Sequence, residues 1–210
     1  MQVELIAITR YLRGEGTPEE LLDYAGRVCY RSQGRGNPAA FLSARVREGH
    51  ESLIEHVSAT FEISGVSRAC THQLVRHRIA SYSQESQRYV AMDDPEWALP
   101  PAISGDPEAL AIWEQFAGQV REAYRALRAR GVRKEDARFV LPNAAATRIV
   151  ATFNFRELRH IFRLRISKHA QWEICELAAR MLEAVYPHAP AVFSDLRDEL
   201  HAQHPEFFAF

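Results

Sequence analysis

Lysine is almost absent from this 210-residue sequence, because only Lys134 and Lys168 among its 26 basic residues are lysines. Arginine carries a planar fork that can grip a phosphate at two points, whereas lysine is a point charge. A genomic preference for arginine would produce the same composition without any function. The positions of the arginines therefore decide what they indicate.

Cysteine is scarce, and long apolar runs are missing. Cys29, Cys70 and Cys175 are widely separated, odd in number and without C-x-x-C spacing, so neither a disulfide framework nor a cysteine zinc site is expected. Their apolar surroundings favour buried, unreactive thiols. No apolar run approaches membrane-spanning length and no targeting pattern opens the chain, which predicts a cytoplasmic protein with no membrane partner.

Net charge is also small. A formal charge of −1 argues against a protein that binds nucleic acid through its overall field, since such domains usually carry a clear basic excess. A hydrophobic fraction of 47% with 25% charged residues is ordinary for a globular protein with one substantial core. Any anion must therefore be held locally.

The hydrophobic pattern predicts a helix-rich α+β fold, a single domain over residues 1–210 with a small, mainly antiparallel sheet. Residues 32–37 are expected to form a loop, and Gly65 to end the second strand. The aromatic stripe around Trp113 is typical of a core or a subunit interface. Predicted helices cover 17–29, 37–49, 68–78, 106–131, 155–165 and 170–186, and predicted strands cover 3–9, 57–63 and 148–154.

The densest polar segment begins with Arg76-His77-Arg78 at the end of the helix over 68–78 and continues through residues 81–89. We expect Gln73, Arg76 and His77 to share the polar face of that helix. The hydroxyls, amides and arginine that follow are the groups that a phosphate or a pyrimidine edge requires. A solvated basic helix end is the alternative explanation, because cations are favourable near a helix C-terminus.

A second basic cluster follows the strand over 148–154. It consists of Asn154, Arg156, Arg159, His160, Arg163, Arg165, Lys168, His169 and Gln171. Arginines at three- and four-residue spacing with only Glu157 as an acidic neighbour should repel one another unless anions lie among them. A bound ligand or solvent ions would both meet that need.

Metal and common nucleotide motifs are missing. His72 and His77 are five residues apart, which places them on different helix faces, and H-E-x-x-H spacing is absent, so no metal is expected. No G-x-G-x-x-G or P-loop pattern occurs. Any nucleotide would have to be held by arginine, amide and hydroxyl groups.

Arg76-His77-Arg78, followed after seven residues by Ser86, resembles the signature of the flavin-dependent thymidylate synthases (ThyX). Further segments resemble the family in the same order: residues 55–56, 65–68, 73–75, 138–142, 154–165 and 169–174. The resemblance covers most of the chain from about His56 to Ile174, and it implies the thymidylate synthase-complementing protein fold.

The resemblance implies a methyltransferase that converts dUMP to dTMP with FAD, NADPH as reductant and 5,10-methylenetetrahydrofolate as carbon donor. It implies a homotetramer whose sites are shared between subunits, and hydride chemistry without an enzyme nucleophile. Carried over by position, the residues expected to hold FAD are His56, Ser58, Arg76, His77, Arg78, Gln84, Asn154, Phe155, Arg156 and His160. Those expected to hold dUMP are Gln73, Leu74, Val75, Arg76, Gln84, Glu85, Ser86, Gln87, Arg88, Arg138 and Arg165.

Arg165 is the expected catalytic residue. A fixed guanidinium beside the uracil ring stabilises an anion at N3, and an electron-richer ring attacks a one-carbon electrophile more readily. Two positions depart from the strictest pattern: Gln84 stands where some members have glutamate, with Glu85 next to it, and His160 stands where some have asparagine. Both replacements keep a hydrogen-bonding group.

Two other classes of protein account for part of the pattern. A single-strand or RNA-binding module would use the arginine clusters with Tyr82, Tyr89 and Phe155 as stacking platforms. A structural oligomer would use only the helix around Trp113. Neither explains the ordered resemblance, so we expect no nucleic-acid partner.

Overall fold

The computed structural model describes residues 1–29, 31–32 and 36–210, which divide into two compact units. The first unit comprises Met1–Gln2, Ile63–Leu74 and Ser83–Ile149, and the second comprises Val3–Glu62, Val75–Tyr82 and Val150–Phe210. The loop expected over 32–37 includes residues 33–35, which lie outside the described residues.

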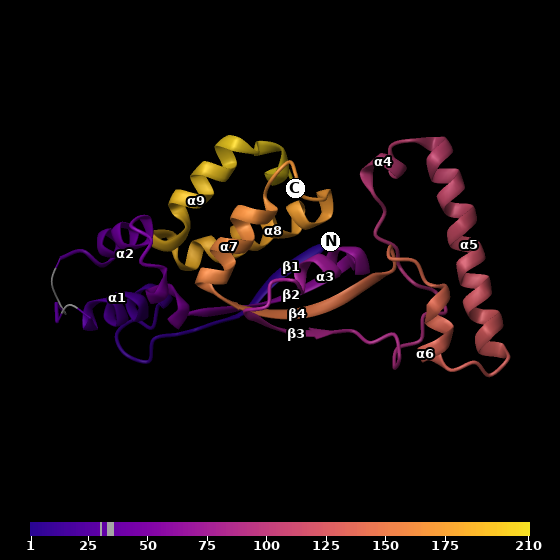
Figure 1. The fold of residues 1–210 in the computed structure, drawn as a ribbon, viewed down its shortest axis with the longest axis horizontal. Helices are drawn as coiled ribbons and strands as arrows, with labels where there is room; N and C mark the ends of the chain where they lie inside the picture. Colours follow the sequence, from indigo (N-terminus) through magenta and orange to yellow (C-terminus); the bar gives the residue numbers. More distant parts are fainter. Residues whose placement is uncertain (30, 33–35) are drawn as a thin grey trace. The chain divides into compact units, whose positions relative to one another are not determined.

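A small antiparallel sheet has the strand order β1-β2-β4-β3 (Figure 1). Its strands are β1 (Gln2–Ile8), β2 (Ser58–Ser67), β3 (Ala80–Gln84) and β4 (Ala146–Asn154). Alternate residues of β2 and β4 are buried, as expected for strands with one face against a core. The predicted helix-rich α+β fold with a small antiparallel sheet is confirmed.

Helices dominate the second unit. They are α1 (Pro18–Val28), α2 (Pro38–Arg47), η1 (Glu51–His56), α7 (Phe155–Arg165), α8 (Trp172–Val185), η3 (Tyr186–His188), α9 (Pro190–Gln203) and η4 (Pro205–Phe208). In its core, α7 contacts α8, α9 and η1. The fully buried ring of Phe193 lies 5.0 Å from Phe155 and 5.9 Å from Phe162, centroid to centroid. These aromatic contacts hold α7, which carries the second basic cluster, in place.

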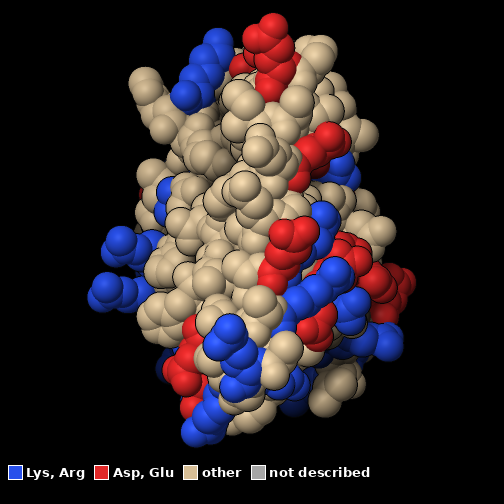
Figure 2. All heavy atoms as spheres, turned by 90° about the vertical axis from the view of Figure 1, so that its right-hand side faces the viewer, with Lys and Arg blue, Asp and Glu red and all other residues tan. Residues whose placement is uncertain are grey.

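The first unit contains α3 (Arg68–Leu74), α4 (Pro101–Ser104), α5 (Pro107–Ala129), α6 (Lys134–Ala137) and η2 (Arg138–Val140). Asp106 caps α5 by accepting hydrogen bonds from the Glu108 and Ala109 amides. Buried Tyr124 on α5 packs with Met92 and Ala137. Figure 2 shows a band of uncharged atoms bordered by charged side chains on the face that includes this unit.

The predicted helix boundaries hold well where a cap defines them, but two local predictions are wrong. β2 continues through Gly65, which takes a positive φ of 69° without ending the strand. The helix predicted over 68–78 ends at Leu74, because the chain then turns and enters β3. Arg76 and His77 therefore do not lie on a helix. The sequence also gave no indication of β3 or α9.

Within the described residues, no helix combines the length and apolar character needed to cross a bilayer.

Candidate functional site

His77 is the centre of a buried polar network in the second unit. Its side chain is 3% exposed, and its Nε2 accepts a hydrogen bond of 3.0 Å from Arg165 Nε, 88 residues later in the chain. Its Nδ1 lies 3.3 Å from Oε1 of Glu157, whose side chain is 9% exposed. The Tyr82 hydroxyl donates to the His77 carbonyl over 2.7 Å, and the His160 ring stands edge-on at 5.6 Å.

The electrostatics of this network keep His77 neutral. Burial, followed by the nearby positive charges of Arg165 and His160, lowers the pKa of His77 to about 4. Burial raises the pKa of Glu157, and His160 opposes that rise. Because the imidazole is neutral at neutral pH, the 3.3 Å approach of His77 Nδ1 to Glu157 Oε1 is not an ion pair there. Because Nε2 accepts from Arg165, the imidazole proton must lie on Nδ1, facing Glu157.

Asn154, the last residue of β4, caps α7, because its side chain accepts a hydrogen bond of 2.8 Å from the Glu157 amide. On the exposed face, Arg156 pairs with Glu55 at 2.5 Å and lies 3.7 Å from Glu51. His56 is exposed at the end of η1, and Ser58 begins β2, where its amide donates to Thr9 Oγ1. These side chains come from η1, β2 and α7, all within the second unit.

The expected repulsion among the α7 arginines is wrong, because protein carboxylates from distant segments pair with them. Arg159 is fully buried and makes two hydrogen bonds of 2.8 Å to Asp195 of α9. Arg163 pairs with Glu51 of η1 at 3.0 Å. No bound anion is needed to account for these two arginines, whose partners are remote in sequence.

The first unit brings Ser86, Arg88 and Arg138 close to Glu135. Arg88 pairs with the Glu135 carboxylate at 3.1 Å, and Arg138 Nε donates to the Glu135 carbonyl at 3.2 Å. Ser86 Oγ accepts from the Arg88 amide at 3.3 Å. Residues from two segments about fifty positions apart in the chain therefore meet within this unit.

Gln84 is anchored inside the first unit by two threonines that the sequence did not single out. Its Nε2 donates to Thr71 Oγ1 at 3.0 Å and to Thr147 Oγ1 at 3.4 Å. Thr71 and Thr147 are buried. The amide of Gln84 is thus held by its own unit.

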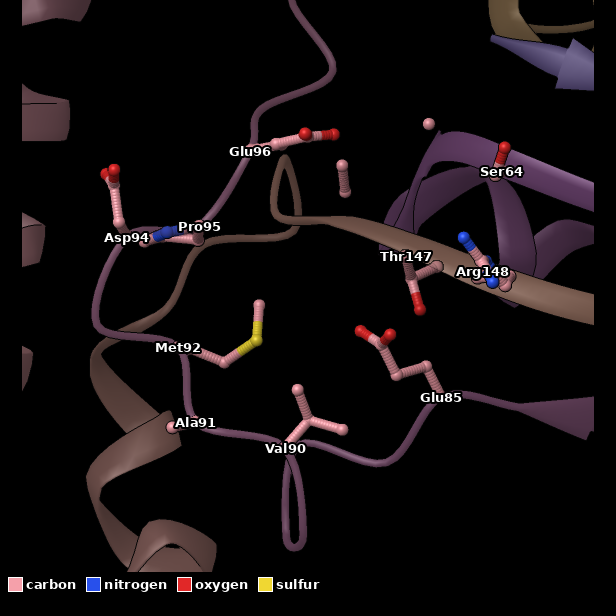
Figure 3. Close-up of a pocket in the computed structure, with 12 residues that line it drawn as sticks. Ser64, Glu85, Val90, Ala91, Met92, Asp94, Pro95, Glu96, Thr147 and Arg148 are labelled. Carbon is pink, nitrogen blue, oxygen red and sulfur yellow. The ribbon is translucent and has the colours of Figure 1, made fainter.

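Glu85 is exposed and faces a cavity of about 280 Å³ in the first unit. Figure 3 shows Glu85 and Met92 projecting into it, with Thr147 and Arg148 of β4 on the opposite wall. Because neighbouring residues of a strand point to opposite sides, the change from Gln84 to Glu85 turns the side chain away from the threonines. The Glu85 carboxylate therefore points toward this cavity, whereas the Gln84 amide points toward Thr71 and Thr147.

Arg68 joins this region although no role was predicted for it. Its Nη1 donates to the Glu85 carbonyl at 3.5 Å, and burial, followed by repulsion from Arg138, lowers its pKa. The sequence signals were its place in the segment 65–68, which resembles the family, and its neighbour Ser67, which caps α3 by accepting from the Cys70 amide at 2.9 Å.

Several predicted site residues are buried in ways that limit direct contact with a ligand. Leu74 is 1% and Phe155 is 0% exposed, and the Phe155 amide already donates to the Val57 carbonyl. The buried Phe155 ring is not available as the stacking platform that the RNA-binding alternative would use, and its place among the expected FAD residues stays a prediction. Gln87 is also buried. Gln73 is half-buried, while Val75, Arg76 and Arg78 are exposed.

The cysteine prediction holds for two of the three thiols. Cys70 and Cys175 are buried, and burial raises the pKa of Cys175. Cys29 is exposed, so its expected burial is wrong. It follows Val28, the last residue of α1, and the helix turns the side chain toward solvent. Among the described residues, no group of three or more potential ligands is arranged to hold a metal ion.

The residues expected to hold FAD and those expected to hold dUMP lie almost entirely in different units. Apart from Gln84, the predicted FAD residues all lie in the second unit. The predicted dUMP residues lie in the first unit, except for Val75, Arg76 and Arg165. The fold and these side chains define a class: a helix-rich α+β protein whose candidate site is built from arginine, histidine and amide donors.

Comparison with known proteins identifies the family. Residues 10–191 match the family model described as thymidylate synthase complementing protein. A flavin-dependent thymidylate synthase from Geobacter sulfurreducens is 47% identical over 189 residues, which cover 85% of this chain and 82% of the relative. One from Mycobacteroides abscessus is 40% identical over 224 residues, covering 93% of this chain and 89% of the relative.

A solved structure is similar as well. The crystal structure of thymidylate synthase X (ThyX) from Helicobacter pylori with FAD and dUMP superposes with a TM-score of 0.72 at 25% identity. The match covers 94% of this chain and 99% of that one. The chain therefore belongs to the flavin-dependent thymidylate synthase family.

Proposed function

We propose that this protein methylates dUMP reductively to dTMP, with FAD as bound cofactor, 5,10-methylenetetrahydrofolate as carbon donor and NADPH as reductant. The observation that carries the proposal is the contact between His77 of the Arg-His-Arg signature and Arg165 of the later basic cluster. Two motifs far apart in the sequence thereby converge on one polar network. The Helicobacter pylori structure contains FAD and dUMP, which supports the same ligands here.

FAD fits the donor set of the second unit. We assign its binding to the exposed groups His56, Arg76, Arg78, Arg156 and His160 with Ser58, His77 and Asn154. The role expected for Gln84, a residue of the first unit, stays a prediction. A dinucleotide with a pyrophosphate and a polar ring edge requires guanidinium, imidazole and amide donors of this kind. When bound, FAD supplies hydride chemistry, which none of the side chains can supply.

The dUMP proposal relies on the first unit. Ser86, Arg88 and Arg138 offer a hydroxyl and two guanidinium groups of the type that binds a phosphate, and Glu135 holds the two arginines near each other. Gln73 and Gln84 offer amides for the pyrimidine edge. Glu85 points toward its own cavity, so we assign it no direct contact with the ring.

Arg165 is the proposed catalytic residue. A guanidinium beside uracil N3 would favour the ring anion and so increase the nucleophilicity of the carbon that accepts the one-carbon unit. No thiol is required to attack the ring. Cys70 and Cys175 are buried, which fits a reaction without an enzyme nucleophile.

We further propose that the two units act as one domain in a cytoplasmic homotetramer. The family model spans residues of both units, and β2, β3 and β4 each contain a unit boundary, so neither unit holds a complete set of strands. Exposed apolar side chains on α5, such as Ile112 at 71% and Phe116 at 41%, suit burial against another subunit.

An absorbance spectrum tests the cofactor proposal. The purified chain is incubated with FAD, desalted and scanned, and a flavin band near ~450 nm is expected. Arg156→Ala should weaken FAD retention, whereas Arg163→Ala on the same helix, outside the proposed set, should not. A folded protein that retains no flavin would contradict the proposal.

The role of Arg165 is tested by Arg165→Ala. We expect weaker dUMP binding and turnover reduced about 10²- to 10³-fold, as for removal of one positioned charge-stabilising donor, with FAD content changed much less. The matched control is again Arg163→Ala, whose side chain pairs with Glu51. Wild-type turnover in Arg165→Ala would eliminate its catalytic role.

A further inference from the structure

Glu157 stands out as a nearly buried carboxylate without an assigned role. Its side chain is 9% exposed and its Oε1 faces the ring nitrogen of His77 that does not accept from Arg165. A carboxylate in such a position must be compensated by hydrogen bonds, because burial of an ionised group is costly. The recorded group nearest to its Oε1 is His77 Nδ1, at 3.3 Å.

We propose that Glu157 is a positioning residue that fixes the proton of His77 on Nδ1 and thereby orients the guanidinium of Arg165. With the proton on Nδ1, the lone pair of Nε2 can only accept, and it accepts from Arg165 Nε at 3.0 Å. The opposite tautomer would place an N–H against the Nε–H of Arg165. The pair would then repel.

The orientation of the Arg165 guanidinium follows from the nitrogen that donates to His77, which is Nε. A guanidinium is planar, so a hydrogen bond at Nε restricts the plane in which both terminal nitrogens lie. Glu157 and Arg165 lie on the same helix, α7, whereas His77 comes from the segment before β3. His77 thus links the two side chains, with one ring nitrogen toward each.

The surrounding charged and titratable groups are compatible with this arrangement. Tyr82 donates to the His77 carbonyl rather than to its ring, and the His160 ring is edge-on at 5.6 Å. His160 lies close enough to oppose the rise in the pKa of Glu157 that burial causes. None of these recorded contacts takes the place of Glu157 at His77 Nδ1.

The inference rests on the proposed role of Arg165 at the substrate, but its structural part can be measured separately. The proton position is read from long-range ¹H–¹⁵N correlation spectra of the FAD-loaded enzyme labelled at histidine. The His77 signal is assigned by its loss in His77→Gln. We expect the wild-type proton on Nδ1, and a proton on Nε2 would overturn the proposal even in an active enzyme.

A matched pair of variants tests the consequence. Glu157→Met keeps the length of the side chain without an acceptor for His77, whereas Glu157→Gln keeps an acceptor oxygen. We expect Glu157→Met to lower kcat about 10- to 100-fold, the range for a misaligned catalytic group, with FAD content retained. Glu157→Gln should restore most of the lost kcat and keep the Nδ1 proton.

Asp195→Asn serves as the structural control, since Asp195 supports α7 through Arg159 and has no recorded contact with His77. It should lower stability without moving the His77 proton or kcat. Equal loss of kcat in Glu157→Met and Asp195→Asn would show a merely structural role and overturn the proposal. An Nδ1 proton in a protein that makes no dTMP would support this geometry and refute the proposed function.

Discussion

The pair between Arg159 and Asp195 leads to a quantitative prediction for Asp195→Asn. Arg159 is 0% exposed, and its two terminal nitrogens each bond an Asp195 oxygen at 2.8 Å. Removing one partner of a buried pair leaves the other charge uncompensated and typically costs about 3–5 kcal/mol. The Asp195 side chain is 34% exposed, however, so water already screens part of the interaction.

We therefore expect the free energy of unfolding to fall by about 2–3 kcal/mol, after a discount for solvent on the aspartate side. In a chain of this size each kcal/mol corresponds to about 2–4 °C, so Tm should fall by about 4–12 °C. Differential scanning calorimetry at a fixed scan rate and protein concentration measures the shift. The carbonyl of Val192, which also accepts from Arg159, remains in place and limits the loss.

Two further variants make the test specific. Asp198→Asn alters an exposed aspartate on the same helix and should change stability by less than about 0.5 kcal/mol. Combining Asp195→Asn with Arg159→Met removes the buried charge and should recover much of the loss. The reasoning fails if Asp195→Asn is as stable as Asp198→Asn, because the buried guanidinium would then not depend on its carboxylate.

Two further outcomes are expected. Burial raises the pKa values of Asp195 and Glu183, but the hydrogen bonds and the positive charges of their partners, Arg159 for Asp195 and Arg197 with His201 for Glu183, together outweigh it, so both folded-state values lie below the unfolded ones. Their stabilising contributions should be complete above about pH 5 and lost as the pH falls through the folded values, so the gap between wild type and Asp195→Asn should close in acid urea titrations. In a timed reaction with a thiol reagent followed by mass spectrometry, exposed Cys29 should be modified well before buried Cys70 and Cys175, and simultaneous modification would contradict the burial pattern.

Local signals in the sequence were sufficient for most helices. The helix predicted over 155–165 has the observed bounds of α7, and the helix predicted from Asp106-Pro107 matches the start of α5. Helical spacing allowed either Phe116 or Ala117 on the inner face of α5, and the structure buries Ala117 while Phe116 is exposed. A helix cap and a helical period depend only on residues that are close in the sequence. Both can therefore be recognised from a single sequence without knowledge of the fold.

The missed features depend on partners that are distant in sequence. β3 has one aromatic residue among alanine, serine and glutamine, and it forms a strand because β4 pairs with it, which this weak local pattern does not indicate. The carboxylates that neutralise α7 lie on η1 and α9, more than thirty residues from their arginines. The His77 tautomer likewise follows from the contacts of Glu157 and Arg165, which only the folded chain brings together.

The self-neutralised surface of α7 has a consequence for selectivity. A helix whose guanidinium groups already hold carboxylates projects little field into the solvent, so a passing polyanion would gain few released counterions by settling there. A ligand that displaces Glu55 from Arg156 must offer a better-shaped anion than the carboxylate it replaces. A ligand that binds to α7 at Arg156 thus replaces the Glu55 carboxylate as the partner of the guanidinium. Such an exchange selects a ligand by the shape of its anionic group and not by its charge alone.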